Sequence, residues 1–167
     1  LLSKNYTAYH VHSELSLLDS ATKFQDYIAR AVQLGQTAIA FTEHGNIYQW
    51  VAKKMACDKA GIKYLHGVEC YLTEQLYEYP DANELWREAQ SGRNEQDAKK
   101  VLAEMMESGK KKVRDNYHTI LIAKNYEGIL EINNLVSLSN RDDHFYYKPR
   151  ITFEEFLGIS DNVIKIS

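Results

Sequence analysis

Short apolar runs alternate along the chain with segments whose apolar residues recur every three or four positions. The runs are typical of buried strands and the periodic segments of amphipathic helices. Strands are predicted at residues 6–12, 37–41, 62–72, 117–123 and 162–167, and helices between 22 and 35, at 46–59, at 126–139 and after Thr152. This alternation predicts an α/β fold with right-handed crossovers and a largely parallel sheet.

Local signals mark the ends of several helices. Residues 22–25 and 152–155 have the pattern of capping boxes, in which the side chains of Thr22 and Thr152 accept from backbone N–H groups of the first turn. Gly35 and Gly61 follow the first two helices, at the position where glycine commonly ends a helix.

Residues 73–115 interrupt the alternation and predict a charged helical insertion with helices at 81–89 and 95–107. Six apolar residues could form a narrow stripe on these helices: Leu85, Trp86, Val101, Leu102, Met105 and Met106. A basic cluster follows at 110–114. Charge runs are most often solvated faces, so the simpler interpretation is an insertion that packs by one face. The alternative is a contact surface for nucleic acid or a partner protein.

Composition narrows the class of protein. The chain has 167 residues, 44% of them hydrophobic, and a net charge of −3, which excludes a global basic field for nucleic acid. It has no apolar run of the ~18–20 residues that a membrane helix needs. Two cysteines, Cys57 and Cys70, suit a reducing compartment, and we expect a cytoplasmic location. The chain lacks an initiator Met and ends inside a predicted strand, so we expect a piece of a longer protein.

Histidines and carboxylates gather near the ends of predicted strands. His10 and His12 form an H-x-H pair, Asp19 follows in a loop, and His44 comes directly after the second strand. Loops that follow parallel strands meet on one face of the sheet, so these side chains are expected to converge, with Glu69 of the third strand pointing to the same place. Mixed nitrogen and oxygen ligands suit Zn²⁺, Mn²⁺ or Fe²⁺, which lower the pKa of bound water for attack on phosphorus.

His118 fits this pattern less simply, because it opens its predicted strand. A long loop or an antiparallel strand would bring it to the cluster. Any one of these residues alone is more often a surface or hydrogen-bonding residue than a ligand. The combination of H-x-H, Asp19 and Glu43-His44-Gly45 is what favours a metal site.

Three motifs resemble the polymerase and histidinol phosphatase (PHP) domain family, in the form found at the N-terminus of bacterial replicative DNA polymerase III alpha subunits. They are His10–Asp19, Phe41–Asn46 and Gly61–Glu69; residues 116–125 and 145–150 are similar to later landmarks of that form. The resemblance spans nearly the whole chain, with 73–115 its least matched part. It implies that residues 1–167 are a PHP domain truncated at its C-terminus, folded as an incomplete, distorted (β/α)7 barrel that resembles a TIM barrel.

The resemblance also implies a set of metal ligands, part of which lies within this sequence. Matched position by position, the metal ligands are His10, His12, Asp19, His44, Glu69 and His118, with Glu69 as a bridging carboxylate and metal-bound hydroxide as the nucleophile. Many relatives have Asp at the position of Glu43, so a contact behind the ligands is expected to differ. The remaining family ligands, a Cys and an Asp-x-His pair, would lie beyond residue 162. A complete domain of the family holds up to three transition-metal ions, and we therefore expect this chain to bind metal weakly or incompletely.

The resemblance leaves more than one function open. The first is metal-dependent phosphoesterase chemistry within a DNA polymerase, a nucleotidyltransferase of DNA replication: 3′–5′ exonuclease proofreading or pyrophosphate hydrolysis. The second is a non-catalytic docking module that contacts the rest of the alpha subunit and the proofreading exonuclease subunit, with DNA bound by the full-length protein. A free-standing phosphatase similar to histidinol phosphatase is a third alternative, which the polymerase-like segment 146–150 disfavours. Polymerase activity itself is not expected in this chain.

Overall fold

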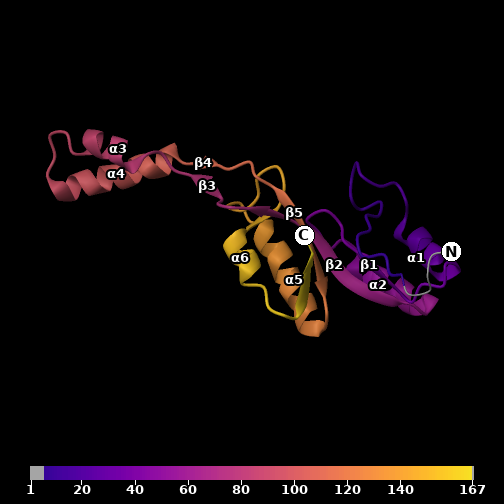
Figure 1. The fold of residues 1–167 in the computed structure, drawn as a ribbon. Coiled ribbons are helices and arrows are strands. Elements are labelled where there is room, and N and C mark those ends of the chain that lie inside the picture. Colours follow the sequence, from indigo (N-terminus) through magenta and orange to yellow (C-terminus); the bar gives the residue numbers. More distant parts are fainter. Residues whose placement is uncertain (1–5, 167) are drawn as a thin grey trace.

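The computed structural model describes residues 6–166. Its strands are β1 (Ala38–Phe41), β2 (Lys63–Thr73), β3 (Tyr77–Glu78), β4 (Lys111–Lys112), β5 (Tyr117–Ala123), β6 (Arg150–Thr152) and β7 (Val163–Ile166). Its helices are α1 (Phe24–Gln33), α2 (Trp50–Ala60), α3 (Ala82–Ala89), α4 (Glu95–Gly109), α5 (Tyr126–Ser139) and α6 (Phe153–Leu157). The molecule is elongated: α1 and α2 lie at one end, α5 and α6 in the middle, and α3 with α4 at the other end (Figure 1).

The long strand β2 organises the sheet. Its first part, Lys63–His66, pairs in parallel with β1, and residues 67–72 pair antiparallel with β5. At Tyr71 and Leu72 it also pairs in parallel with β6, and β7 adds antiparallel to β5. The prediction of a largely parallel sheet is therefore wrong: the described strands form a mixed five-stranded sheet. The α/β class is confirmed, but the described residues do not show a closed (β/α)7 barrel.

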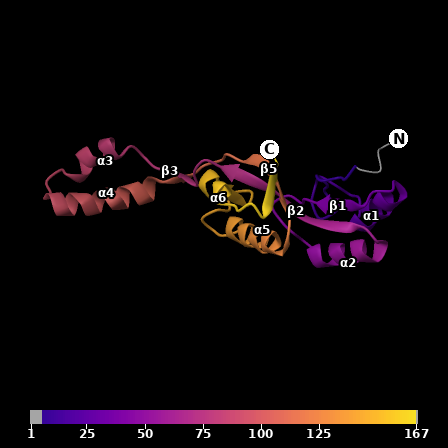
Figure 2. The same cartoon turned by 60° about the horizontal axis from the view of Figure 1, so that its bottom comes forward.

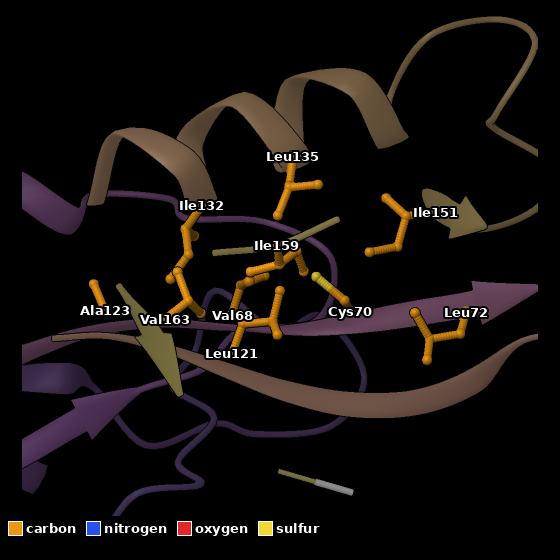
Figure 3. Close-up of a cluster of buried hydrophobic side chains, with 10 residues drawn as sticks. All are labelled: Val68, Cys70, Leu72, Leu121, Ala123, Ile132, Leu135, Ile151, Ile159 and Val163. Carbon is orange, nitrogen blue, oxygen red and sulfur yellow. The ribbon is translucent and has the colours of Figure 1, made fainter. Parts of the chain in front are cut away.

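Two apolar clusters pack on different parts of this sheet. The larger cluster joins alternate residues of β2, Val68, Cys70 and Leu72, to α5, β5, β7 and Ile159 (Figure 3). The second joins α1 and α2 to β1, around the buried ring of Phe41. Because successive strand residues point to opposite faces, the packing of Val68, Cys70 and Leu72 under α5 turns Glu69 and Tyr71 to the other face.

The N-terminal segment differs from its prediction. Residues 6–12 form no regular strand; Ala8 makes an isolated parallel bridge to Ile39, and Val11 accepts from the N–H of Thr42. The helix α1 begins at Phe24 rather than after Thr22, with no side-chain cap from its N-cap residue. Instead, the Glu14 carboxylate accepts from the N–H of Phe24 at 2.9 Å, so a residue from the preceding loop replaces the predicted capping box.

Other predicted boundaries agree more closely with the structure. The helix predicted at 46–59 begins only at Trp50, because residues 46–49 form a turn that ends with Gln49 in the left-handed region. The helix at 126–139 is confirmed, and so is the second capping box, in which Thr152 and Glu155 bond each other's backbone N–H groups. The last predicted strand is observed as β7; Ser167 lies outside the described residues.

The segment 73–115 forms an arm that projects from the sheet. A two-stranded ribbon of β3 and β4 carries the antiparallel helices α3 and α4, far from the other helices in both views (Figures 1 and 2). Most of the predicted apolar stripe lies between these two helices and is only half-buried. The predicted helical insertion is therefore observed, with the addition of the ribbon.

Candidate metal centre

The structure brings the six predicted ligands into one cluster around Glu69 of β2. Two groups of side chains each have donor atoms that all lie within 4.8 Å of one another. One group is His10, His12 and Glu69, and the other is His12, Asp19 and His44. His118 joins them through Glu69, with 2.7 Å between its Nδ1 and the Glu69 Oε1. The antiparallel pairing of β5 with β2 places His118 here, which is one of the two routes considered from the sequence. That these residues bind metal stays a prediction.

Glu69 is the centre of the cluster. Its carboxylate is 2% exposed and faces four imidazoles. Its Oε2 lies 2.7 Å from His10 Nε2 and 3.0 Å from His12 Nε2. Its Oε1 lies 2.7 Å from His118 Nδ1 and 3.1 Å from His44 Nδ1. Each oxygen of this carboxylate therefore faces a different pair of imidazoles, and the bridging role expected of Glu69 stays a prediction.

The donor set fits divalent transition metals. Among the described residues, Glu69 Oε1 is buried without a hydrogen bond of acceptable geometry, although two ring nitrogens lie near it. An unsatisfied buried carboxylate oxygen is costly, and a cation held between it and the imidazoles would remove that cost. Imidazole and carboxylate ligands suit Zn²⁺, Mn²⁺ or Fe²⁺. Six side chains cannot saturate three ions that take about four ligands each, so solvent, substrate or residues elsewhere would complete the coordination.

Charge within the cluster alters two pKa values. Burial alone would raise the pKa of Glu69, but hydrogen bonds from His12 and His10 and the nearby His44 and His118 outweigh it and lower the pKa to about 2. The hydrogen bond to Glu69 raises the pKa of His12, against the lowering effect of burial. Glu69 is therefore ionised throughout the neutral range. Bound cations must compete with protons for His12.

A serine behind the cluster fixes the orientation of His12. The Ser16 hydroxyl donates to Glu43 Oε2 at 2.5 Å and accepts from the backbone N–H of His44 at 3.2 Å. The Nδ1 of His12 lies 3.2 Å from the same oxygen. Because the only hydrogen of Ser16 goes to Glu43, the Nδ1 of His12 must be the donor. In the neutral imidazole, which has lost the Nε2 proton that faces Glu69, this leaves the lone pair of His12 Nε2 directed at the cluster, as a metal ligand requires.

Glu43 is held by a buried ion pair that sequence reasoning missed. Lys53 Nζ donates to Glu43 Oε1 at 2.6 Å, and both side chains are at most 2% exposed. Glu43 also accepts from the backbone N–H and the hydroxyl of Ser13. The ammonium of Lys53 lies 5.1 Å from the centre of the Phe41 ring. Hydrogen bonds from Lys53 and the serines lower the pKa of Glu43 although burial raises it. Glu43 thus lies behind the candidate ligands with Lys53 as its counter-ion, and a difference from relatives with Asp at this position stays a prediction.

Tyr71 and Gly45 fix the position of His44. The Tyr71 hydroxyl lies 2.8 Å from His44 Nδ1, and burial raises the pKa of Tyr71 to about 12, so the phenol stays protonated and can donate. Gly45 has a φ of 59°, and an added Cβ there would clash with Pro149 Cγ. The Glu-His-Gly motif therefore needs its glycine for both the backbone conformation and the close approach of the 145–149 loop.

The remaining histidines and the cysteines lie outside the cluster. His66 is buried between Tyr64 and Asn133, and burial lowers its pKa to about 4. His144 bonds Asp143 and Glu155. Cys57 and Cys70 are buried in the two apolar clusters, which raises the pKa of each thiol and keeps it protonated. Neither cysteine therefore contributes a ligand to the cluster.

Comparison with known proteins defines the class. The fold and the cluster are those of an α/β domain with a candidate polynuclear metal centre. The family model of the PHP domain matches residues 8–167, and the chain therefore belongs to the PHP domain family.

Relatives and a solved structure extend the comparison. The chain is 32% identical over 155 residues to DNA polymerase III subunit alpha of Borreliella burgdorferi, covering 93% of this chain and 11% of that protein. It is 30% identical over 166 residues to the same subunit of Aquifex aeolicus, covering 99% of this chain and 12% of that protein. The chain thus spans about a tenth of the length of these relatives. An amidohydrolase from Chromobacterium violaceum aligns with a TM-score of 0.45 at 16% identity, over 80% of this chain and 32% of that one.

Within residues 6–166, every helix is too short or too polar to cross a bilayer.

Proposed function

We propose that this PHP domain is a metal-dependent phosphoesterase within a DNA polymerase III alpha subunit. The observation that carries the proposal is the buried Glu69 carboxylate, whose two oxygens face four imidazoles and whose Oε1 lacks a hydrogen bond among the described residues. We propose His10, His12, Asp19, His44, Glu69 and His118 as the ligands of zinc, manganese or iron. When bound, such ions supply Lewis-acid activation of a phosphoryl oxygen and of water.

The chain's own residues divide the remaining work. Glu69 stays ionised and joins the two halves of the cluster, and Ser16 holds His12 in the tautomer that directs Nε2 inward. Asp19 is about half exposed and lies 3.2 Å from His44 Nε2, at the solvent side where a phosphoester would enter. In the hydrolysis, a bond forms between water oxygen and phosphorus, the ester P–O bond breaks, and a water proton passes to the leaving oxygen.

Two substrates follow from the sequence resemblance and are distinguished by one experiment. The purified protein is stripped with a chelator, and hydrolysis of a single-stranded oligonucleotide and of pyrophosphate is measured before and after Zn²⁺, Mn²⁺ or Fe²⁺ is restored. We expect no hydrolysis in the stripped protein and recovery with metal, because the proposed reaction needs a bound cation to activate water and the phosphoryl oxygen. Release of mononucleotides from the 3′ end identifies an exonuclease; release of phosphate from pyrophosphate alone identifies a pyrophosphatase. Equal rates with and without metal would contradict the proposal.

The arm favours a second role, as a docking element for the polymerase or its exonuclease subunit. The helices α3 and α4 pack on each other while Trp86, Leu102 and Met105 remain half-buried, and the pair projects away from the sheet (Figure 2). Apolar side chains left partly open on a projecting element are typical of contact surfaces.

Deletion of the arm tests this role. Residues 79–110 are replaced by Asn-Gly, which can connect the paired strand ends Glu78 and Lys111 as a two-residue hairpin turn. We expect the melting temperature to change little, because the arm packs mainly on itself, and we expect binding of the exonuclease subunit to be lost in calorimetry. Unchanged binding of that subunit by the shortened full-length polymerase would contradict the docking role and leave the metal centre unaffected.

A further inference from the structure

A cavity of about 290 Å³ opens directly beside the metal cluster. Its wall includes the ligand His44 and the residues that follow it as far as Tyr48, together with the C-terminal end of α5 and Phe145 and Pro149 of the next loop. This volume lies near the lower end of the range that small organic groups occupy in proteins, roughly 300–1,000 Å³. A group bound here would lie next to His44 without displacing any predicted ligand.

The cavity is lined by aromatic and apolar side chains. Tyr48 is 61% exposed and Phe145 is 43% exposed, and both contribute to its wall, with Ile47, Val136 and Pro149. Neither ring belongs to an apolar core cluster of the described residues. Exposed rings at a cavity provide flat surfaces on which a planar group can stack, and nucleobases stack on such rings whatever their sequence.

Positive charge lies near His44, the predicted ligand in the wall of this cavity. Lys148 Nζ lies 4.2 Å from the centre of the Tyr71 ring, whose hydroxyl contacts His44. Among residues 6–166, Lys148 forms no salt bridge with a carboxylate. Arg114 lies farther along the same surface, 5.6 Å from the ring of the exposed Tyr147. A cation without an acidic partner, next to a phosphoesterase site, is suited to a phosphate of the substrate backbone.

We propose that this cavity binds the terminal base of a single-stranded nucleic acid and that Lys148 binds an adjacent backbone phosphate. The base stacks against Tyr48 and Phe145, which places the neighbouring phosphodiester beside His44. Pyrophosphate has no planar group for this cavity, so the geometry favours a nucleic-acid substrate. This inference rests on the proposed phosphoesterase function, because the bound base serves to position the phosphodiester for hydrolysis. The binding of the base itself does not require metal.

Binding of a fluorescein-labelled oligothymidylate of roughly 12 nucleotides, within the usual site sizes, tests the inference by anisotropy in the presence of EDTA. We expect Tyr48→Ala and Phe145→Ala each to weaken binding about tenfold, as loss of a stacking partner does. Lys148→Gln should weaken binding and reduce the salt dependence by about one released counterion. All three residues are at least partly exposed, so the variants should fold, which melting temperatures check.

Matched controls use the same residue types elsewhere. Tyr126→Ala removes a ring that is 66% exposed at the start of α5, roughly 15–20 Å along the helix from the cavity. Lys99→Gln removes an exposed charge on α4. Both controls should bind the oligonucleotide as the unmodified protein does.

The outcomes separate this inference from the proposed function. Equal oligonucleotide affinity in all five variants would overturn the inference, even where metal-dependent hydrolysis of pyrophosphate persists. If the cavity variants keep their oligonucleotide affinity but no longer bind a protein partner, the inference is overturned and the cavity is a peptide site. Cavity-dependent binding by a protein that hydrolyses no phosphoester with metal would support the inference and contradict the phosphoesterase function.

Discussion

Glu69→Gln is expected to abolish metal-dependent hydrolysis while the protein remains folded. The substitution keeps the shape of the side chain but removes the negative charge that faces four imidazoles. Without it, any cation held by these imidazoles would lose its carboxylate ligand and the negative charge that offsets its own. Metal activation is worth several kcal/mol in the transition state, so a loss of about a thousandfold or more in rate is expected.

The measurements are metal content by elemental analysis, affinity by calorimetry, and hydrolysis rate. Glu104→Gln is the matched control, because it makes the same change at an exposed position on the arm, remote from the cluster. We expect the control to retain metal, rate and melting temperature. A Glu69→Gln protein with normal metal content and normal rate would exclude the cluster as the active centre.

The grouping of the candidate ligands could be predicted from the sequence better than the directions of the strands that carry them. The six candidate ligands lie close together as expected: Ala8, just before the H-x-H pair, bridges to β1, and His44, just after β1, bridges to Glu69 of β2. His10, His12, His44 and Glu69 meet in the part of the sheet where the strand pairing is parallel: Ala8 pairs with β1, and β1 pairs with the first part of β2. His118 reaches Glu69 because β5 runs antiparallel to β2, and the long segment before β5 permits that reversal.

Strand direction and local irregularity were not predictable from periodicity. The period of a strand is the same in parallel and antiparallel sheets, so the pattern of β5 and β7 carries no sign of their direction. Residues 6–12 have β-forming composition, but they make only scattered bonds along β1 while His10 and His12 turn into the cluster. The capping box predicted at Thr22 does not form, and Glu14 caps the helix instead by accepting from the N–H of Phe24. The two residues are ten positions apart, so a pattern of neighbouring residues could not predict this contact.

The role of Lys53 was missed because a single lysine in a helix is normally solvated. The available signal was its spacing: Lys53 and Cys57 are four residues apart, and both lie on the buried face of α2. A lysine on such a face needs an acidic partner. The unusual carboxylate already noted at Glu43, ten residues earlier, was a candidate for it.

Lys53→Met is expected to destabilise the fold by about 3–5 kcal/mol at neutral pH, the usual cost of removing one partner of a buried ion pair. Methionine fills most of the same volume, so the loss reports on the uncompensated Glu43 carboxylate. Lys54→Met is the matched control: its partner Asp58 is exposed, and such surface pairs contribute at most about 1 kcal/mol. Urea unfolding measures both changes. Equal effects of the two substitutions would contradict a structural role of the buried pair.

The loss of folding stability in Lys53→Met depends on pH, and the pKa of Glu43 determines the direction of that dependence. In the unmodified protein the pKa of Glu43 is lowered, so its contribution is present above its unfolded pKa and is lost as pH falls through the folded value. Without Lys53, burial dominates and raises that pKa, so the folded variant takes up a proton more readily than the unfolded chain and loses stability as pH rises. The difference between the two proteins should therefore be largest near neutral pH and shrink in acid.

A double substitution links this pair to the metal cluster. Glu43→Gln in the Lys53→Met background removes the uncompensated charge and should restore much of the stability, with a coupling that a double-mutant cycle measures. Metal affinity should not recover with it, because Ser16 then loses its charged acceptor and no longer fixes the donor role of His12 Nδ1. A loss of about 10–100-fold in metal affinity is typical when such an outer contact is removed. Recovery of both stability and metal affinity would show that the pair supports the fold alone.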